Sequence, residues 1–324
     1  MKTASSHTCL GPLETSLSPV GKLLILVGAT GLICLPVKAA ITVDGMLDAG
    51  YGSALAVQSV QTAFGDSTYN GTPNGPDADG SELDAAYGTV QGGYFYLFLA
   101  GNFQNNGNHV NVFIADGRAG QNTLAAPTGN TLGPAMNGSV FSSGFDATLA
   151  LDLNDYQGTA YVEEYSLVGT PSGGYAGSFA LSSGIGTGSP GGSIMYGLNN
   201  SNTGGVVGGT GAADTGAASA VTTGLEIQIP LSMLGNPSGN IQVVADINGG
   251  GDGYLSNQFL PGLPSGTDNV GGGGTYSGSG SGQFDFGLTP GQYLSVPVPE
   301  PSSLAFAGLG SLLAWAASRK RRSV

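Results

Sequence analysis

Glycine interrupts this chain at short and irregular intervals, which restricts most of it to short secondary-structure elements. The sequence has 59 glycines in 324 residues, and they follow no fixed period, which excludes a collagen-like triple helix. Between Asp44 and Pro297, short apolar or alternating runs recur between Gly, Asn, Asp, Ser and Pro, and no run has a helical period. This pattern is typical of an all-β protein.

The alternating runs predict eleven strands and one turn of helix at residues 231–234. We expect residues 85–91 and 94–100 to form a hairpin across Gly92 and Gly93, and the second arm to be a central strand because both its faces are apolar. Residues 184–192, 204–220 and 262–282 are predicted loops. The fold class is therefore all-β: a single antiparallel, jelly-roll-like β-sandwich with long glycine-rich loops. The predicted strands are Ile41–Val43, Ala54–Val60, Ala85–Gln91, Tyr94–Ala100, His109–Ala115, Phe145–Leu151, Ala160–Val168, Thr223–Ile229, Ile241–Ile247, Gln283–Leu288 and Gln292–Val296.

Residues 1–39 are predicted to be a secretory signal peptide with a signal helix. A long n-region precedes an apolar core, Leu23 to Leu35, which is short for a membrane span. Val37 and Ala39 are tolerated at the −3 and −1 positions of a cleavage site, so we expect cleavage after Ala39 and export by the Sec machinery. Both cysteines lie in this segment, so the domain at residues 40–296 has no disulfide and no thiolate chemistry.

Charge is distributed very unevenly along the chain. Seven of the eight Lys and Arg residues lie in the two terminal segments, so Arg118 is the only cation of the 40–296 domain. Nineteen of the 21 Asp and Glu residues lie in that same domain. A nucleic-acid partner is excluded because nothing could neutralise its phosphates. The acidic excess favours solubility and cation binding.

The C-terminal segment, residues 297–324, combines three features in a fixed order. Val298-Pro299-Glu300-Pro301 is rigid because proline fixes φ. Residues 302–318 carry no charge and are near the minimum of about 17 residues for a helix that crosses hydrocarbon. Arg319-Lys320-Arg321-Arg322 follows as a basic tail that fits the positive-inside rule.

A rigid motif, an apolar span and a basic tail in this order resemble the PEP-CTERM sorting signal of Gram-negative bacteria. The resemblance implies a C-terminal transmembrane helix that holds the chain in the inner membrane as an intermediate. It also implies that an exosortase processes the chain at Pro299-Glu300-Pro301. The product would then reside at the cell surface or in the extracellular matrix, where exopolysaccharide is an expected partner.

Two further segments resemble parts of carbohydrate-binding sandwich modules of the family-nine-like type. Residues 41–48 are similar to their V-D-G-x-L-D opening, and residues 224–234 are similar to their G-x-E-x-x-I-P-x-x-x-L strand and turn. The resemblance implies a β-sandwich. Those modules clamp sugars with exposed tryptophans, whereas the one tryptophan here, Trp315, lies in the sorting segment. Residues 246–258 also resemble a run shared by uncharacterised exported PEP-CTERM proteins.

An acidic loop is the first candidate metal site. Asp77, Asp79, Glu82 and Asp84 place four carboxylates in a loop rich in Gly and Pro, and hard oxygen ligands on such a loop suit Ca²⁺. The spacing is not that of an EF-hand. The alternative is a solvated acidic turn in which Asp84 begins a strand. Apart from Ca²⁺, the sequence suggests no cofactor.

Asp246, Asn248 and Asp252 form a second candidate Ca²⁺ site. They lie at the end of a predicted strand among glycines that leave backbone carbonyls free. The alternative is a glycine turn after a strand, where Asn and Asp are preferred because their side chains bond to their own backbone.

Catalytic signatures are weak in this sequence. His109 is the only histidine of the domain, and we expect it to be a half-exposed sandwich residue. No serine lies in a G-x-S-x-G motif. Glu163 and Glu164 are adjacent, so on a strand they point to opposite faces and cannot pair in glycoside hydrolysis. We therefore predict a non-enzymatic exported protein. One alternative is a glycan-binding module that stacks sugars on tyrosines. The other is a carboxylate-dependent glycan hydrolase or lyase.

Overall fold

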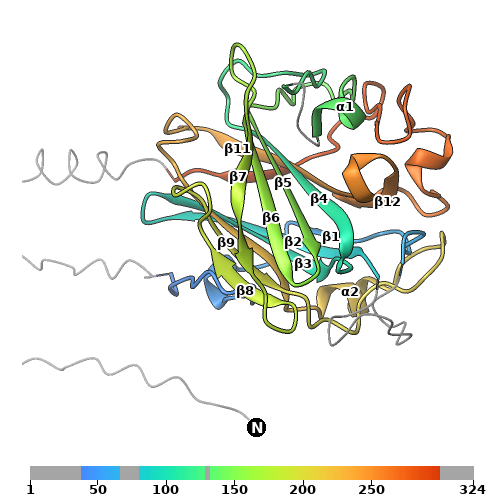
Figure 1. The fold of residues 1–324 in the computed structure, drawn as a ribbon, viewed down its shortest axis with the longest axis horizontal. Helices are drawn as coiled ribbons and strands as arrows, with labels where there is room; N and C mark the ends of the chain where they lie inside the picture. Colours follow the sequence, from blue (N-terminus) through green and yellow to red (C-terminus); the bar gives the residue numbers. More distant parts are fainter. Residues whose placement is uncertain (1–37, 66–79, 128–131, 300–324) are drawn as a thin grey trace, which may run out of the picture. The chain divides into compact units, whose positions relative to one another are not determined.

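The computed structural model describes residues 38–65, 80–127 and 132–299. The chain divides into two compact units, Met1–Lys38 and Ala39–Val324, and every element below belongs to the second. The described part of this unit is all-β, with two antiparallel sheets and only short helices (Figure 1).

The first sheet has six strands in the order β1-β2-β3-β10-β9-β8. The hairpin of β2 and β3 across Gly92 and Gly93 confirms the prediction, and so does the central place of β3 between β2 and β10. The six strands are β1 (Ala56–Val57), β2 (Glu82–Gln91), β3 (Tyr94–Asn102), β8 (Ile185–Gly188), β9 (Met195–Asn199) and β10 (Gly224–Pro230).

The second sheet runs in the order β12-β11-β4-β5-β6-β7, and β13 pairs with β11 beside that path. Its pairings are all antiparallel. The strands are β4 (Asn106–Ala115), β5 (Leu149–Tyr156), β6 (Thr159–Ser166), β7 (Ser172–Ala180), β11 (Asn240–Asn248), β12 (Leu255–Leu260) and β13 (Leu294–Pro297).

The strand order differs from the two Greek keys of a jelly roll. The consecutive runs β1–β3, β4–β7 and β8–β10 each keep to one sheet, so their strands mostly pair with their neighbours in sequence. The two antiparallel sheets therefore agree with the prediction, but the strands are not connected as in a jelly roll.

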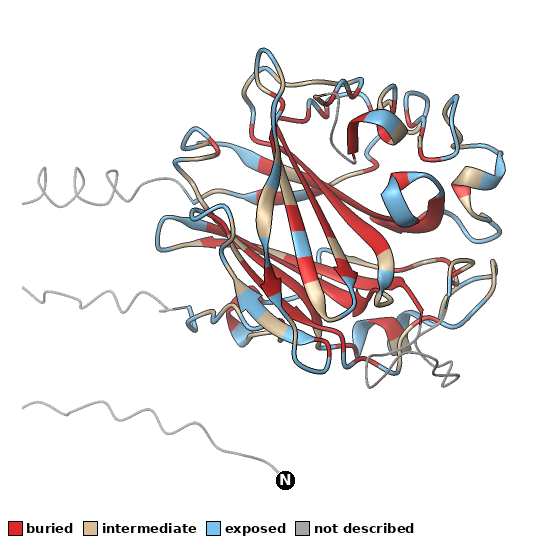
Figure 2. Ribbon diagram, in the orientation of Figure 1, coloured by how far each residue is buried: buried red, intermediate tan, exposed pale blue. Residues whose placement is uncertain are grey.

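The main core lies between the sheets and is built by alternation. Val110, Val112 and Ile114 of β4 point into it, as predicted, and meet the inward residues of β3, Phe95, Leu97 and Leu99. Figure 2 shows the buried residues concentrated along the central strands. The alternate residues of β4 are thereby directed to the opposite face of the second sheet.

That opposite face is covered as well, which the alternation alone does not reveal. Long connections that include α1 (Leu132–Met136) bring a second cluster of buried aromatic residues onto Phe113 of β4. Phe141 and Phe284 contact the Phe113 ring edge-on, with centroids 5.0 and 6.1 Å away. The His109 face of the sheet is therefore interior, so the prediction of a half-exposed histidine is wrong: His109 is only 7% exposed.

Some strand predictions are wrong. Residues 41–43 and 283–288 form no strand, and the chain near them makes single bridges such as Met46 with Thr223. The strand predicted at 145–151 begins only at Leu149. Strands β7, β8, β9 and β12 were not predicted, because glycine and polar residues hide their alternation; β8 lies within a stretch predicted as loop.

Two short helical elements also fall in stretches predicted as loops. They are α2 (Thr215–Ser219) and the 3₁₀ turn η3 (Val270–Gly272); η1 (Ala49–Tyr51) follows the first turn of the domain. Leu231–Leu234 forms a turn in which the Leu234 N–H donates to the Leu231 carbonyl, close to the predicted helical turn. No helix among the described residues is long and apolar enough to span a membrane. The predicted signal helix and the predicted span at 302–318 lie outside the described residues.

Candidate functional site

A row of polar side chains crosses the covered face of the second sheet. Asp246 of β11 pairs with Asn111 of β4, Asn111 pairs with Asp152 of β5, and Asp152 pairs with Glu163 of β6. Residues that pair directly on antiparallel strands have Cβ atoms about 4.5–5.5 Å apart. Strand register alone therefore gathers three carboxylates and an amide on one surface. Asp246, Asn111 and Asp152 are all buried.

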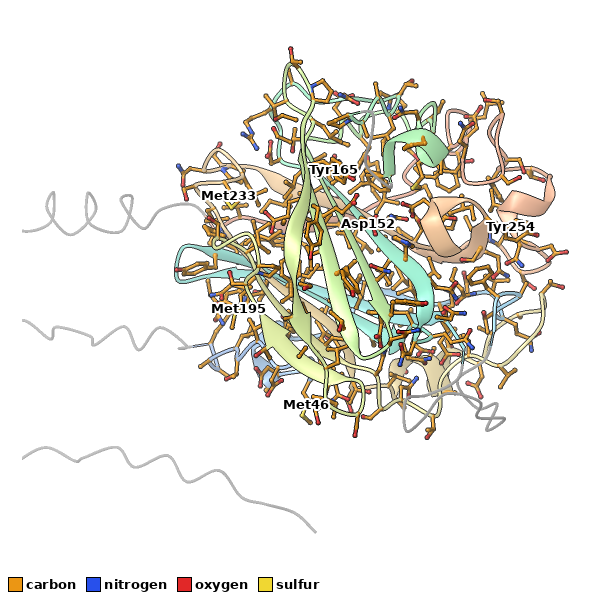
Figure 3. All side chains as sticks on the ribbon, viewed as in Figure 1. Met46, Asp152, Tyr165, Met195, Met233 and Tyr254 are labelled. Carbon is orange, nitrogen blue, oxygen red and sulfur yellow. The ribbon has the colours of Figure 1, made fainter. Side chains whose placement is uncertain are left out.

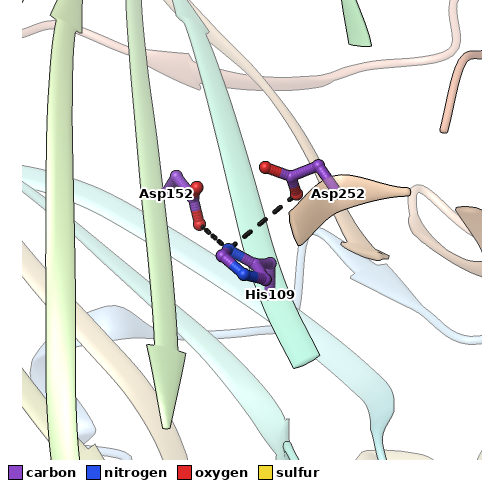
Figure 4. A group of neighbouring side chains, drawn as sticks. All are labelled: His109, Asp152 and Asp252. Carbon is purple, nitrogen blue, oxygen red and sulfur yellow. Dashed lines mark hydrogen bonds and ion pairs between the residues drawn. The ribbon is translucent and has the colours of Figure 1, made fainter. Parts of the chain in front are cut away.

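A short turn adds a fourth carboxylate to this row. The 3₁₀ turn η2 (Gly250–Asp252) follows β11, and Asp252 adopts a φ of +54° that aims its side chain back at the sheet. Its Oδ1 accepts a hydrogen bond of 3.1 Å from the Asn111 amide and lies 3.9 Å from His109 Nδ1. His109, Asp152 and Asp252 each offer a ligand atom within 4.8 Å of the others (Figure 4).

Asn248 fixes the turn that carries Asp252. Its Oδ1 accepts hydrogen bonds from the backbone N–H groups of Gly249 and Tyr254, and its amide donates to the Gly282 carbonyl. Asn248 thus plays the turn role that the sequence offered as the alternative, while Asp246 and Asp252 enter the cluster.

His109 is held between the cluster and the turn. Its Nδ1 lies 2.6 Å from Asp152 Oδ1, and the Gly251 N–H donates to its Nε2 over 3.3 Å. Burial lowers the pKa of His109, but the charge and hydrogen bond of Asp152 outweigh burial and leave that pKa above its ordinary value. The Gly251 N–H opposes protonation of Nε2 because it needs that nitrogen as an acceptor. His109 therefore orients Asp152 with its Nδ1–H.

Several oxygens of the cluster are buried without a hydrogen-bond partner. Asp246 is the clearest case, since neither of its carboxylate oxygens has one although the residue is fully buried. A buried carboxylate without partners is costly, so each needs a physical explanation. The unpartnered oxygens of the cluster are Asn111 Oδ1, Asp152 Oδ2, Asp246 Oδ1, Asp246 Oδ2 and Asp252 Oδ2.

The electrostatics of the cluster are unfavourable to the ionised carboxylates. Burial, followed by the charge of Asp152, raises the pKa of Asp246 well above its ordinary value. Burial and the charges of Asp152 and Asp246 do the same to the pKa of Asp252. Arg118, the single Lys or Arg of the 40–296 domain, is paired with Asp116 at 2.5 Å. The domain therefore brings no Lys or Arg of its own to this cluster.

A pocket of about 260 Å³ opens beside the cluster. Tyr161 and Tyr175 form one side of it, with ring centroids 6.5 Å apart, and they are 37% and 61% exposed. Figure 3 places Asp152 and Tyr165 on the second sheet; the Tyr165 hydroxyl donates to Glu163, which also lines the pocket. The lining residues are His109, Asp152, Asn154, Tyr161, Glu163, Tyr175 and Gly251.

The two adjacent glutamates of β6 point to opposite faces, as the sequence predicts. Glu163 lines the pocket, whereas Glu164 accepts a hydrogen bond of 2.9 Å from the hydroxyl of Tyr196, a residue of the core between the sheets. Burial raises the pKa of Glu164. Glu163 has a different carboxylate neighbour, Asp152 on the adjacent strand.

The acidic loop of the sequence is only partly within the described residues. Asp77 and Asp79 lie outside them. Glu82 and Asp84 are fully buried on β2, where the Asn202 amide donates to both and the Val206 N–H donates to Asp84 over 2.8 Å. Asp84 thus stands in a strand, but that strand begins at Glu82, and the solvated turn of the alternative interpretation is wrong for these two residues, since both are buried. Both carboxylates have partners within the fold.

The two segments that resemble carbohydrate-binding modules meet in the structure. The Glu226 carboxylate accepts hydrogen bonds from the N–H groups of Asp44 and Gly45, at 2.9 and 3.1 Å, and from the Tyr51 hydroxyl at 2.8 Å. Burial raises the pKa of Glu226 to about 7, although these hydrogen bonds act in the opposite direction. Glu226 therefore joins the first segment of the domain to β10.

Sequence reasoning found Asp246 and Asp252 but missed Asn111 and Asp152. Those two residues lie on strands β4 and β5, in runs that show only ordinary alternation. The only indication in the sequence is the alternation of these strands, which places Asn111 and Asp152 on the face opposite the main core. Nothing local shows that this face is covered, or that β11 lies next to β4.

The sorting segment begins where the sandwich ends. Pro297 closes β13 opposite Asn240, the Val298 N–H donates to the Gly239 carbonyl, and Pro299 is exposed. Glu300, Pro301 and the basic tail at 319–322 lie outside the described residues.

Comparison with curated proteins and with solved structures gave no match. Residues 297–322 match the family model of the PEP-CTERM protein-sorting motif, which implies an exported protein that passes the membrane and is processed by an exosortase.

Proposed function

We propose that this chain delivers a non-enzymatic β-sandwich to the cell surface or the extracellular matrix, where it associates with exopolysaccharide. The observation that carries the proposal is the sorting motif at 297–322, which directly follows the last strand. The acidic excess of the domain favours solubility, which suits an extracellular role. In this proposal the Sec machinery exports the chain, the inner membrane holds it as an intermediate, and an exosortase then processes it.

Fractionation tests the sorting step. An epitope tag inserted between Gly273 and Gly274, an exposed turn, follows the chain in strains with and without exosortase. We expect a shortened, released or surface-bound product with exosortase and an intact membrane-bound chain without it. A Glu300→Ala variant in the exosortase strain should behave like the wild type without exosortase. An intact membrane-bound chain in both strains would contradict the proposal.

Glycan binding is a second candidate, favoured by the tyrosine side of the pocket. Tyr161 and Tyr175 are exposed next to Asn154 and Glu163, and tyrosine rings can stack on sugars while their hydroxyls bond outward. Tyr175→Ala should then weaken retention on immobilised exopolysaccharide from the producing cells. Tyr156→Ala, which removes another exposed tyrosine outside the lining of this pocket, is the matched control. Equal retention of both variants and the wild type would count against this candidate.

A glycan hydrolase or lyase is the third candidate, and one observation favours it. Asp152 and Glu163 are cross-strand neighbours that line the same pocket, an arrangement compatible with paired carboxylates. Each is also engaged elsewhere, Asp152 by His109 and Glu163 by Tyr165. Release of reducing ends from exopolysaccharide by the wild type, and its loss in Glu163→Gln, would replace the non-enzymatic proposal.

A further inference from the structure

We infer that Asp152, Asp246, Asp252 and Asn111 form a binding site for one hard divalent cation of the Ca²⁺ type. The four residues come from three different segments, β4, β5 and the stretch from β11 to η2, that the sheet register and the turn bring together. This inference does not depend on how the chain is sorted.

The unpartnered oxygens are the first support. Five oxygens of the cluster are buried without a hydrogen-bond donor, and they belong to all four residues. Three carboxylates and an amide carbonyl form a hard oxygen donor set, and Ca²⁺ takes six to eight such ligands in flexible geometry. A cation would bind the oxygens that the fold leaves without partners.

Charge balance is the second support. Three carboxylates are buried together, while the single arginine of the domain is paired with Asp116. Buried charges are normally paired or coordinate a metal. A divalent cation would neutralise most of the charge that the protein itself leaves unbalanced.

The surroundings fit a metal site in two further ways. His109 donates from Nδ1 to Asp152 Oδ1 and so fixes the orientation of that carboxylate, as outer partners of metal ligands do. The 260 Å³ pocket reaches His109 and Asp152 from the surface and offers an entry path. His109 is thus a positioning residue in this arrangement, because Asp152 and Gly251 already occupy its two nitrogens.

The test uses the full chain, purified and stripped with EDTA. The chain is equilibrated with Ca²⁺, Mg²⁺ or Zn²⁺, bound metal is measured by mass spectrometry, and thermal unfolding is followed by circular dichroism. We expect one Ca²⁺ per chain and a rise in melting temperature with Ca²⁺ concentration, as mass action requires. Absence of bound cation in the wild type would overturn the inference.

Variants locate the site. Asp246→Asn and Asp152→Asn should both lose the bound Ca²⁺ and the Ca²⁺-dependent rise in melting temperature. Glu226→Gln, which changes a buried but fully partnered carboxylate in the other sheet, should keep both. If Asp152→Asn fails to fold, Asp252→Asn is used instead, because Asp252 lies in a turn rather than in a strand. Ca²⁺ bound equally by wild type, Asp246→Asn and Asp252→Asn would overturn the inference.

Two more variants separate neighbouring explanations. Asp84→Asn should leave Ca²⁺ binding unchanged; its loss there, with binding retained in Asp246→Asn, would move the site to the acidic loop of the first sheet. His109→Gln should weaken Ca²⁺ binding without abolishing it, since Gln can still donate to Asp152. Binding of Zn²⁺ instead of Ca²⁺, abolished in His109→Gln, would overturn the oxygen-ligand assignment.

Discussion

Glu226 and Asp246 are both fully buried carboxylates, on strands that follow one another in the chain, yet their surroundings differ completely. Glu226 accepts hydrogen bonds from two backbone N–H groups and a tyrosine hydroxyl. Asp246 accepts none, and it interacts unfavourably with the carboxylates of Asp152 and Asp252. The first carboxylate is hydrogen-bonded within the fold, whereas neither oxygen of the second has a hydrogen-bond partner.

The comparison distinguishes two kinds of buried carboxylate, those with hydrogen-bond donors and those without. A buried carboxylate that is fully hydrogen-bonded joins chain segments, and removing it leaves donors without acceptors. A buried group of carboxylates without donors destabilises the protein until a cation joins it. The total number of acidic residues cannot distinguish the two cases, because the distinction lies in what each oxygen faces.

The largest effect on stability is expected from Glu226→Ala. The change leaves the N–H groups of Asp44 and Gly45 and the Tyr51 hydroxyl without their acceptor, so the free energy of unfolding should fall by about 2–4 kcal/mol. Urea denaturation followed by tyrosine fluorescence measures it. Glu226→Gln keeps an acceptor oxygen and should lose less. A loss in Glu226→Ala no larger than in Glu226→Gln would mean that these hydrogen bonds do not hold the segment.

A smaller effect is expected from pH. The pKa of Glu226 is about 7 in the folded chain against an ordinary value of 4.5. Between these values the folded state keeps a proton that the unfolded state has lost, so this group's contribution to stability falls as pH rises. Wild type should therefore lose stability relative to Glu226→Gln between pH 5 and 7.5, as measured by urea midpoints. Parallel pH profiles for the two proteins would show that Glu226 does not titrate there.

The smallest effect, of opposite sign, is expected from Asp246→Asn in EDTA. Without a cation, the substitution removes a buried carboxyl group whose ionisation is opposed by burial and by Asp152, and it leaves no donor without an acceptor. The free energy of unfolding should therefore rise by about 1 kcal/mol. The same urea measurement reports it. If Asp246→Asn instead lowered the free energy of unfolding as much as Glu226→Ala, Asp246 would stabilise the fold as Glu226 does, and the difference between the two carboxylates would not hold.

The predictable part of the fold follows from short-range patterns. Alternation in residues 94–100 and 109–115 identifies β3 and β4 and the faces of their side chains, because strand geometry has a period of two. The glycine pair at 92–93 marks the hairpin turn. Strands β7 and β8 escape because their glycines and exposed positions remove the alternation, and pairing with β6 and β9 makes them strands.

The sequence by itself determined the sorting segment, since a motif, an apolar run and a basic tail are read in linear order, and the match at 297–322 confirms it. It also determined that the domain has a single arginine and many carboxylates. Only the tertiary structure decided which carboxylates share a space. Asp152 reaches His109 across 43 residues of sequence and Asp246 through the shared neighbour Asn111. Such contacts depend on which strands pair and in which register, and this is set by the packing of the whole sandwich rather than by any local run of residues.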